Sequence, residues 1–102
     1  MKPWWLLASA ALLTAAAPDA APVVATDTGQ VRGAMADAVE AFLAIPYAAP
    51  PVGALRWRAP QPAAHWSGVR EAGAIGPDCI QAREASDTRP MAEDCLTANV
   101  WR

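Results

Sequence analysis

Residues 41–57 read AFLAIPYAAPPVGALRW, and residues 93–101 read EDCLTANVW. The first stretch starts as an apolar run and continues through three prolines, which exclude an α-helix and remove backbone donors from a sheet. We therefore expect an extended segment over residues 39–43 and an ordered loop over residues 45–62. The second stretch closes on a β-prone run and predicts a strand over residues 96–101.

Two more extended segments are expected nearer the N-terminus. Residues 23–26, VVAT, are β-prone and are followed by the turn-forming residues 27–29, DTG. An alternating pattern resumes over residues 30–33. Together with residues 39–43, these segments predict a small antiparallel meander.

The first 17 residues have the composition of a secretory signal peptide. Lys2 precedes an uncharged run from Trp4 to Leu13, and small alanines follow. The run stops before Pro18 and is shorter than the roughly 20 residues that a membrane span needs, so we expect no stable membrane anchor. The predicted peptide ends between residues 16 and 21, and the product is expected to be secreted or periplasmic.

Composition limits what the remaining residues can do. About a quarter of the chain is alanine, which buries little area per residue, so the core is expected to be small. The net charge of -2 comes from interspersed signs and forms no basic patch, so nucleic acid is not an expected partner. We expect no cofactor.

Cys79 and Cys95, with 15 residues between them, are the only cysteines. In an exported chain, two cysteines indicate one disulfide, and closing a loop of this length stabilises by roughly 3 kcal/mol in the chain-entropy picture. A free thiol pair and a metal site are the alternatives. Zinc needs four ligands at short spacing, and His65 is the only histidine, so no metal site is predicted.

Six sequence blocks occur in an order that resembles the N-terminal portion of the type-B carboxylesterases, the cholinesterase-like branch of the α/β-hydrolases. The blocks are Thr26–Gly33, Ile45–Ala48, Pro50–Gly53, Trp66–Val69, Gly76–Cys79 and Glu93–Leu96. Three positions depart from the family pattern. Ala44 stands where glycine is usual, Thr97 replaces a common tyrosine, and Ala98 replaces a larger aliphatic residue at an expected core position, at a cost of order 1–3 kcal/mol.

The resemblance implies an α/β fold class, with residues 18–102 as a truncated N-terminal part of the hydrolase domain. This fragment would comprise short antiparallel strands, a proline-rich loop, a disulfide loop and one further sheet strand. The resemblance also implies that Cys79 and Cys95 form the disulfide. It further implies a structural ion pair between Arg56 and Glu93, which would anchor the proline-rich loop.

The residues that hydrolyse esters in this family are not found in the chain. The family uses a serine on a Gly-x-Ser-x-Gly turn, then an acid and a histidine, with backbone amides for the oxyanion. Ser67 lies in His65-Trp66-Ser67-Gly68, which is not such a turn, and Ser86 has no such context either. We therefore assign no catalytic residue and expect an ester hydrolase fragment that is inactive alone. A small secreted, disulfide-stapled binding protein is the alternative function.

The loop between the cysteines bears on the substrate of a full-length parent. In cholinesterases this loop contributes a tryptophan that holds the quaternary ammonium group, but residues 80–94 contain no aromatic residue. Arg83 and Arg89 would repel a cation, or are solvated loop charges, so the expectation is the absence of choline selectivity. The resemblance thus implies small neutral esters as substrates. The tryptophans at 57, 66 and 101 are expected to be core or loop anchors.

Overall fold

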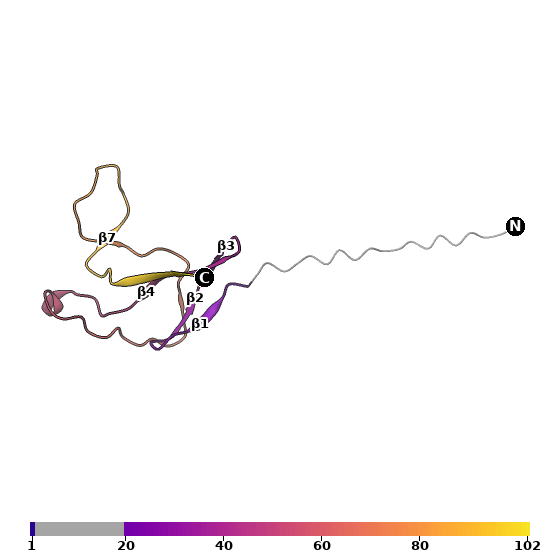
Figure 1. The fold of residues 1–102 in the computed structure, drawn as a ribbon, viewed down its shortest axis with the longest axis horizontal. Helices are drawn as coiled ribbons and strands as arrows, with labels where there is room; N and C mark the ends of the chain where they lie inside the picture. Colours follow the sequence, from indigo (N-terminus) through magenta and orange to yellow (C-terminus); the bar gives the residue numbers. More distant parts are fainter. Residues whose placement is uncertain (2–19) are drawn as a thin grey trace.

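The structure is a computed structural model that describes residue 1 and residues 20–102. The predicted signal peptide lies outside the described residues except for Met1, and so does most of the range given for its end. Over the described residues the chain forms short strands and irregular loops, with one 3-10 turn (Figure 1). No helix in this part of the chain has the length and apolar character needed to cross a membrane.

The first sheet has the strand order β1-β2-β5. Strands β1 (Val23–Ala25) and β2 (Gln30–Arg32) are antiparallel, and β5 (Val69–Glu71) lies parallel to β2 on its other side. The β1–β2 turn is closed by the Thr26 amide, which donates to the Gly29 carbonyl at 2.9 Å. A Cβ at Gly29 would lie 2.5 Å from the Trp66 indole nitrogen, so only glycine lets this ring pack against the turn.

The second sheet has the order β3-β4-β8. Strands β3 (Ala34–Ala36) and β4 (Val39–Pro46) form a hairpin, and β8 (Thr97–Trp101) runs antiparallel to β4. The register places Phe42 opposite Val100 and then shifts at a bulge before Ile45. The bulge contains Ala44 at a φ of 55°, a left-handed conformation that glycine adopts without strain. This backbone conformation explains why glycine is usual at this position in the family.

The predicted meander is confirmed for the antiparallel β1–β2 pair and wrong for its third segment. Strand β4 joins β3 and β8 instead of β2, and it extends to Pro46, into the segment expected to be a loop. Strands β3 and β5 were not expected. The β2–β5 contact is parallel and joins segments 39 residues apart, which no local pattern reveals. In the proline-rich loop, the 3-10 turn η1 (Gly53–Leu55) interrupts the irregular chain.

The core is small, as the alanine content predicts. Val31, Phe42 and Ala72 form its centre at 1%, 3% and 1% exposure, and Val24, Ile45 and Trp66 pack around it. Trp66 is therefore an anchor, and its indole N–H donates to the Gln30 carbonyl at 2.8 Å. The same expectation is wrong for two other tryptophans: Trp57 is fully exposed and Trp101 is more than half exposed. Ala98 is also exposed, so in this chain it is not a core position.

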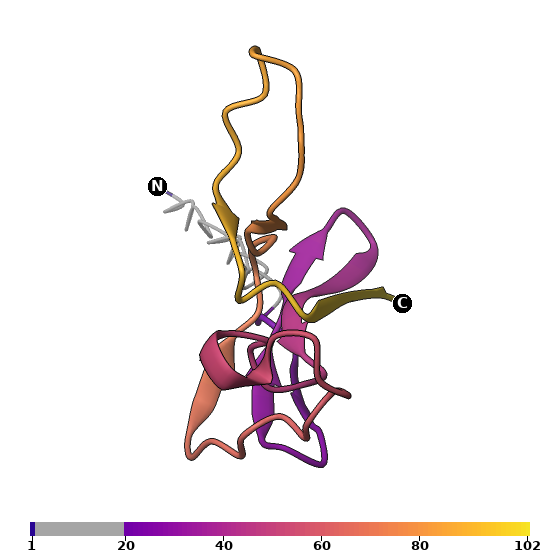
Figure 2. The same cartoon turned by 90° about the vertical axis from the view of Figure 1, so that its left-hand side faces the viewer.

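The remaining strands form a separate two-stranded sheet. Strands β6 (Asp78–Cys79) and β7 (Met91–Ala92) are parallel and lie at the base of the loop between the cysteines. In two perpendicular views this loop projects away from the other sheets (Figures 1 and 2). It therefore forms a region of its own and is not part of the core.

Candidate functional site

The loop between residues 79 and 95 is closed covalently. The structure joins Cys79 to Cys95 with an S–S distance of 2.11 Å and Cα atoms 5.1 Å apart. Cys79 belongs to β6, and Cys95 precedes β8, so the disulfide connects the projecting loop to the sheet that contains the longest strand. No free cysteine is present among the described residues.

Arg56 and Glu93 form an ion pair that joins the proline-rich loop to the end of the disulfide loop. Arg56 follows η1 and donates through Nε to Oε1 of Glu93 at 2.7 Å and through Nη2 to Oε2 at 2.5 Å. The hydrogen bonds from Arg56 hold the pKa of the Glu93 carboxyl below its ordinary value, and they raise the pKa of Arg56. Both side chains are about half exposed, at 54% and 42%. Such a bidentate pair fixes orientation more than it adds stability.

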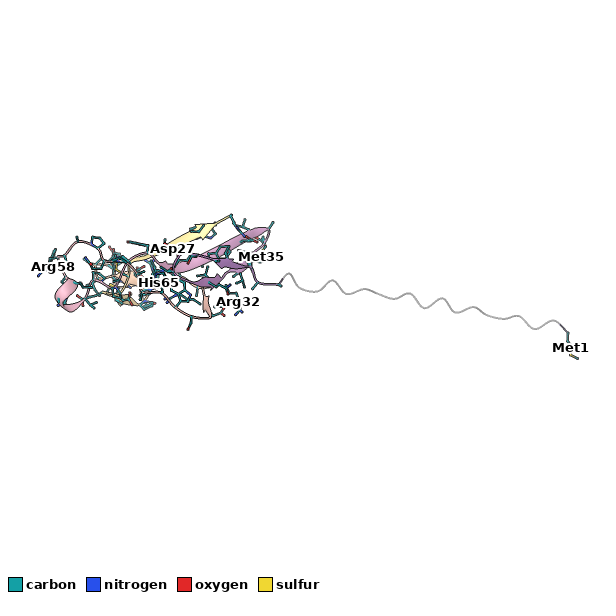
Figure 3. All side chains as sticks on the ribbon, turned by 90° about the horizontal axis from the view of Figure 1, so that it is seen from below. Met1, Asp27, Arg32, Met35, Arg58 and His65 are labelled. Carbon is teal, nitrogen blue, oxygen red and sulfur yellow. A yellow bond between two sulfur atoms is a disulfide. The ribbon has the colours of Figure 1, made fainter. Side chains whose placement is uncertain are left out.

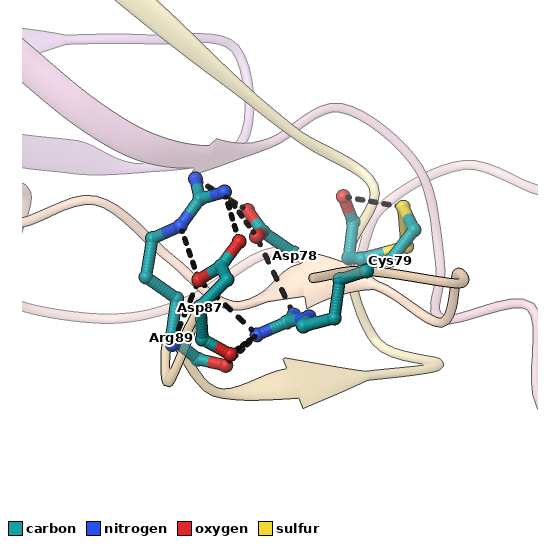
Figure 4. A network of polar contacts seen from close by, with 6 residues as sticks. Asp78, Cys79, Asp87 and Arg89 are labelled. Atoms are coloured by element: carbon teal, nitrogen blue, oxygen red, sulfur yellow. Dashed lines mark hydrogen bonds and ion pairs between the residues drawn. A yellow bond between two sulfur atoms is a disulfide. The ribbon is translucent and has the colours of Figure 1, made fainter. Parts of the chain in front are cut away.

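The loop itself contains a cluster of four charged residues that sequence reasoning missed (Figure 4). Arg83 is its centre, with a side chain only 14% exposed, and lies within 3.5 Å of Asp78 and of Asp87. Its Nη1 also donates to the backbone carbonyl of Arg89. Arg89 is at the surface, where its Nη2 donates to Asp87 at 2.8 Å and lies 3.2 Å from Asp78.

The cluster corrects the expectation that the loop arginines would repel a cation. Arg83 and Arg89 are each paired with Asp78 and Asp87, so two positive charges face two negative ones. Hydrogen bonds from the Arg89 side chain, then from its backbone, hold the pKa of Asp87 well below its ordinary value. The cluster therefore carries no net charge, and its arginines do not repel a cation. The absence of an aromatic side chain is what remains of the argument against choline binding.

A cavity of about 420 Å³ lies between the two main sheets and the loop base. Its lining comprises Ala44, Pro46, Ala48, Pro50, Ala63, Ala64, His65, Trp66, Arg70, Gly76, Pro77, Ala92, Asp94 and Thr97. Small apolar residues predominate, and the lining includes no serine or cysteine. Asp94 is thus a cavity residue, whereas its neighbour Glu93 pairs with Arg56.

His65 lines a second cavity of about 380 Å³, together with Asp27 and Tyr47. Figure 3 labels the side chains of His65 and Asp27. Among the described residues, no hydrogen bond connects His65 to Ser67, and Ser67 lies in an exposed bend. The described part of the chain also brings together no group of three potential metal-ligating side chains. Within residues 20–102 the arrangement provides a frame with several hollows and no nucleophile hydrogen-bonded to a base.

Solved structures show which fold this frame belongs to. Residues of this chain superpose on a structure of PNB esterase with a TM-score of 0.75 and 37% sequence identity, covering 80% of this chain and 18% of that one. A thermophilic PNB esterase gives the same TM-score at 36% identity. The strand-rich chain thus has the fold of part of an α/β-hydrolase.

Comparison with sequences defines the family. Residues 20–102 match the carboxylesterase family, and the chain belongs to it. The chain is 45% identical over 101 residues to fumonisin B1 esterase of Sphingopyxis macrogoltabida, covering 95% of this chain. It is 43% identical over 88 residues to phenmedipham hydrolase of Pseudarthrobacter oxydans, covering 78% of this chain. The chain spans 18% of the length of each of these two relatives.

Proposed function

We propose that this chain contributes the N-terminal part of a carboxylic ester hydrolase and does not hydrolyse esters by itself. The match of residues 20–102 to the carboxylesterase family carries the first part of the proposal. The cavity between the sheets, whose lining has a histidine and a threonine but no serine or cysteine, supports the second. A nucleophile, its base and the oxyanion donors act as a unit, so a lone histidine gives no turnover. In the whole protein these groups would come from other residues.

The test is ester hydrolysis by the purified 102-residue chain. We expect 4-nitrophenyl butyrate to be hydrolysed at the buffer rate, and Ser67→Ala to change nothing. PNB esterase, assayed in parallel, is the positive control for ester hydrolysis under these conditions. Hydrolysis above the buffer rate that Ser67→Ala or His65→Gln abolishes would contradict the proposal.

The proposed substrates of the whole protein are small neutral carboxylic esters. One feature of the loop supports this: residues 80–94 offer no aromatic face for a quaternary ammonium group. A suitable test protein is a chimera in which residues 20–102 replace the matching part of PNB esterase. We expect kcat/KM for butyrylcholine not to exceed that for ethyl butyrate. A clear preference for the choline ester would contradict the assignment of substrate class.

We further propose that the chain is exported. The charge of Lys2, the uncharged run after it and the alanines before Pro18 support this, as does the disulfide, because such bonds persist in oxidising compartments. Residues 1–40 fused to a phosphatase that is active only after export should give activity. The double variant Leu6→Arg/Leu7→Arg, which interrupts the apolar run, should abolish it. Equal phosphatase activity in both fusions would contradict export by this leader.

A further inference from the structure

The base of the projecting loop is held by contacts that do not involve the disulfide. Strand β6 pairs with β7 in the register Asp78 with Met91 and Cys79 with Ala92. The Asp78 amide also donates to the Pro90 carbonyl at 3.0 Å. These bonds bring the residues beside Cys79 next to a segment that ends three residues before Cys95.

Four charged side chains also connect the outgoing and returning halves of the loop, next to the β6–β7 pair. Arg83 links Asp78, beside Cys79, to Asp87 and to the backbone carbonyl of Arg89 on the returning half of the loop (Figure 4). Arg89 adds a second link from the returning half to Asp78. We call Asp78, Arg83, Asp87 and Arg89 the charged clamp.

Burial makes the clamp sensitive to the loss of one member. The side chains of Arg83 and Asp78 are 14% and 19% exposed. The buried atoms Asp78 Oδ2 and Arg83 Nη2 have no hydrogen-bond partner among the described residues; they lie 3.5 Å apart, and Asp78 Oδ2 also lies 3.2 Å from Nη2 of Arg89. A carboxylate in such surroundings depends on nearby positive charge. Opening the loop would separate these charges, so the clamp favours the closed loop whether or not the sulfurs are bonded.

We propose that the charged clamp holds the two thiols of the reduced chain beside each other, so that the Cys79–Cys95 disulfide re-forms by exchange and resists reduction. The exposed Cys79 thiolate attacks one sulfur of glutathione disulfide and releases one glutathione thiolate. The Cys95 thiolate then attacks the sulfur of Cys79 and releases the second. Two cysteine thiols and one glutathione disulfide thus give one protein disulfide and two glutathione thiols. This role does not depend on the proposed ester hydrolysis.

The experiment is equilibration of the 102-residue chain in glutathione buffers, with the oxidised fraction measured by thiol alkylation and mass spectrometry. We expect Arg83→Gln to lower the equilibrium constant for disulfide formation by about tenfold, which is about 30 mV for a two-electron couple. Arg83→Lys should recover part of the loss. Arg58→Gln, at an exposed position of the proline-rich loop, is the matched control and should leave the constant unchanged.

Two further measurements distinguish the effect of the clamp on the disulfide from an effect of general unfolding. Arg89→Gln removes a surface member, with a side chain 67% exposed, and should lower the constant by a smaller factor while the far-ultraviolet circular dichroism stays unchanged. The wild-type chain in 8 M urea, where the clamp is absent, should show a constant at least as low as that of Arg83→Gln. If the constants of wild type, Arg83→Gln and Arg89→Gln agree within twofold, or if urea leaves the wild-type constant unchanged, the proposal is wrong.

Discussion

The β4–β8 strand pair and the disulfide loop are joined at Cys95, yet they are stabilised in opposite ways. The strand pair relies on backbone hydrogen bonds and on Phe42, which is buried at 3% exposure. The loop has no buried apolar side chain among its residues and relies on one covalent bond, four charged side chains and the short β6–β7 pairing at its base. In the loop, the charged side chains pair with one another. On β8, by contrast, apolar side chains such as Val100 and Trp101 are exposed to solvent.

The difference shows which part of the chain depends on further contacts. Every charged side chain of the clamp finds its partner within residues 78–89. Strand β8, by contrast, is an edge of its sheet within residues 20–102, and exposed strand edges readily pair with other chain segments. The loop is therefore expected to keep its shape in substitution variants that unfold the two three-stranded sheets.

Truncation of the core residue gives the largest expected effect. Phe42→Ala should lower the free energy of unfolding by about 3–5 kcal/mol, enough to unfold a chain with so small a core. Trp57→Ala, a control at a fully exposed aromatic residue, should change it by less than about 0.5 kcal/mol. Urea unfolding followed by circular dichroism measures both. Equal losses in the two variants would contradict the location of the core.

Proline scanning of β8 tests which backbone groups support the strand pair. The amides of Glu40 and Arg102 donate to each other's carbonyls, so the alternation places the Val100 amide toward β4 and the Trp101 amide toward the free edge. Val100→Pro should therefore cost about 1–3 kcal/mol, whereas Trp101→Pro should cost much less. Urea midpoints of the two variants measure the difference. A larger loss for Trp101→Pro would show that the register is wrong.

The bulge in β4 gives a smaller, stabilising prediction. Ala44 has a φ of 55°, so Ala44→Gly removes left-handed strain of about 1–2 kcal/mol and adds backbone entropy of about 0.5–1 kcal/mol to the unfolded chain. We expect a net gain of about 0.5–1 kcal/mol by thermal unfolding. Ala98→Gly, opposite Ile45 on β8, lacks this strain and should lose stability by a similar amount. A loss in both variants would contradict the strain at Ala44.

The smallest expected effect concerns the Arg56–Glu93 pair, which joins the proline-rich loop to the disulfide loop. Because Arg56 lowers the folded-state pKa of Glu93 from its ordinary 4.5, the pair stabilises above pH 4.5 and its contribution is lost as the pH falls through the folded pKa. The difference in urea midpoint between wild type and Glu93→Gln should thus be constant from pH 7 to about 5.5 and close below pH 4.5. An unchanged difference at pH 3 would contradict this sign.

Local patterns predicted individual strands and the course of the proline-rich loop. The β1 and β2 segments, the β8 strand and the general course of the proline-rich loop follow from β-propensity and from the effect of proline on the backbone. The Cys79–Cys95 bond and the Arg56–Glu93 contact were placed through the family resemblance, and the structure has both.

Contacts between distant segments were not predictable in the same way. The parallel β2–β5 pairing depends on how the whole loop between them folds, and a three-residue strand such as β5 has no periodic signal. The clamp was missed because Arg83 binds a backbone carbonyl that only the folded loop presents. The spacing of Arg83 and Asp87, four residues apart, was its only sequence signal, and the loop is not helical.

The chimera with PNB esterase tests most directly whether this chain is a working part of an ester hydrolase. With residues 20–102 in place of the matching segment, we expect kcat/KM for 4-nitrophenyl butyrate to stay within about tenfold of that of PNB esterase, a change of about 1.4 kcal/mol in transition-state stabilisation. The isolated chain should give only the buffer rate under the same conditions. A chimera that unfolds cooperatively but hydrolyses no ester would contradict the account.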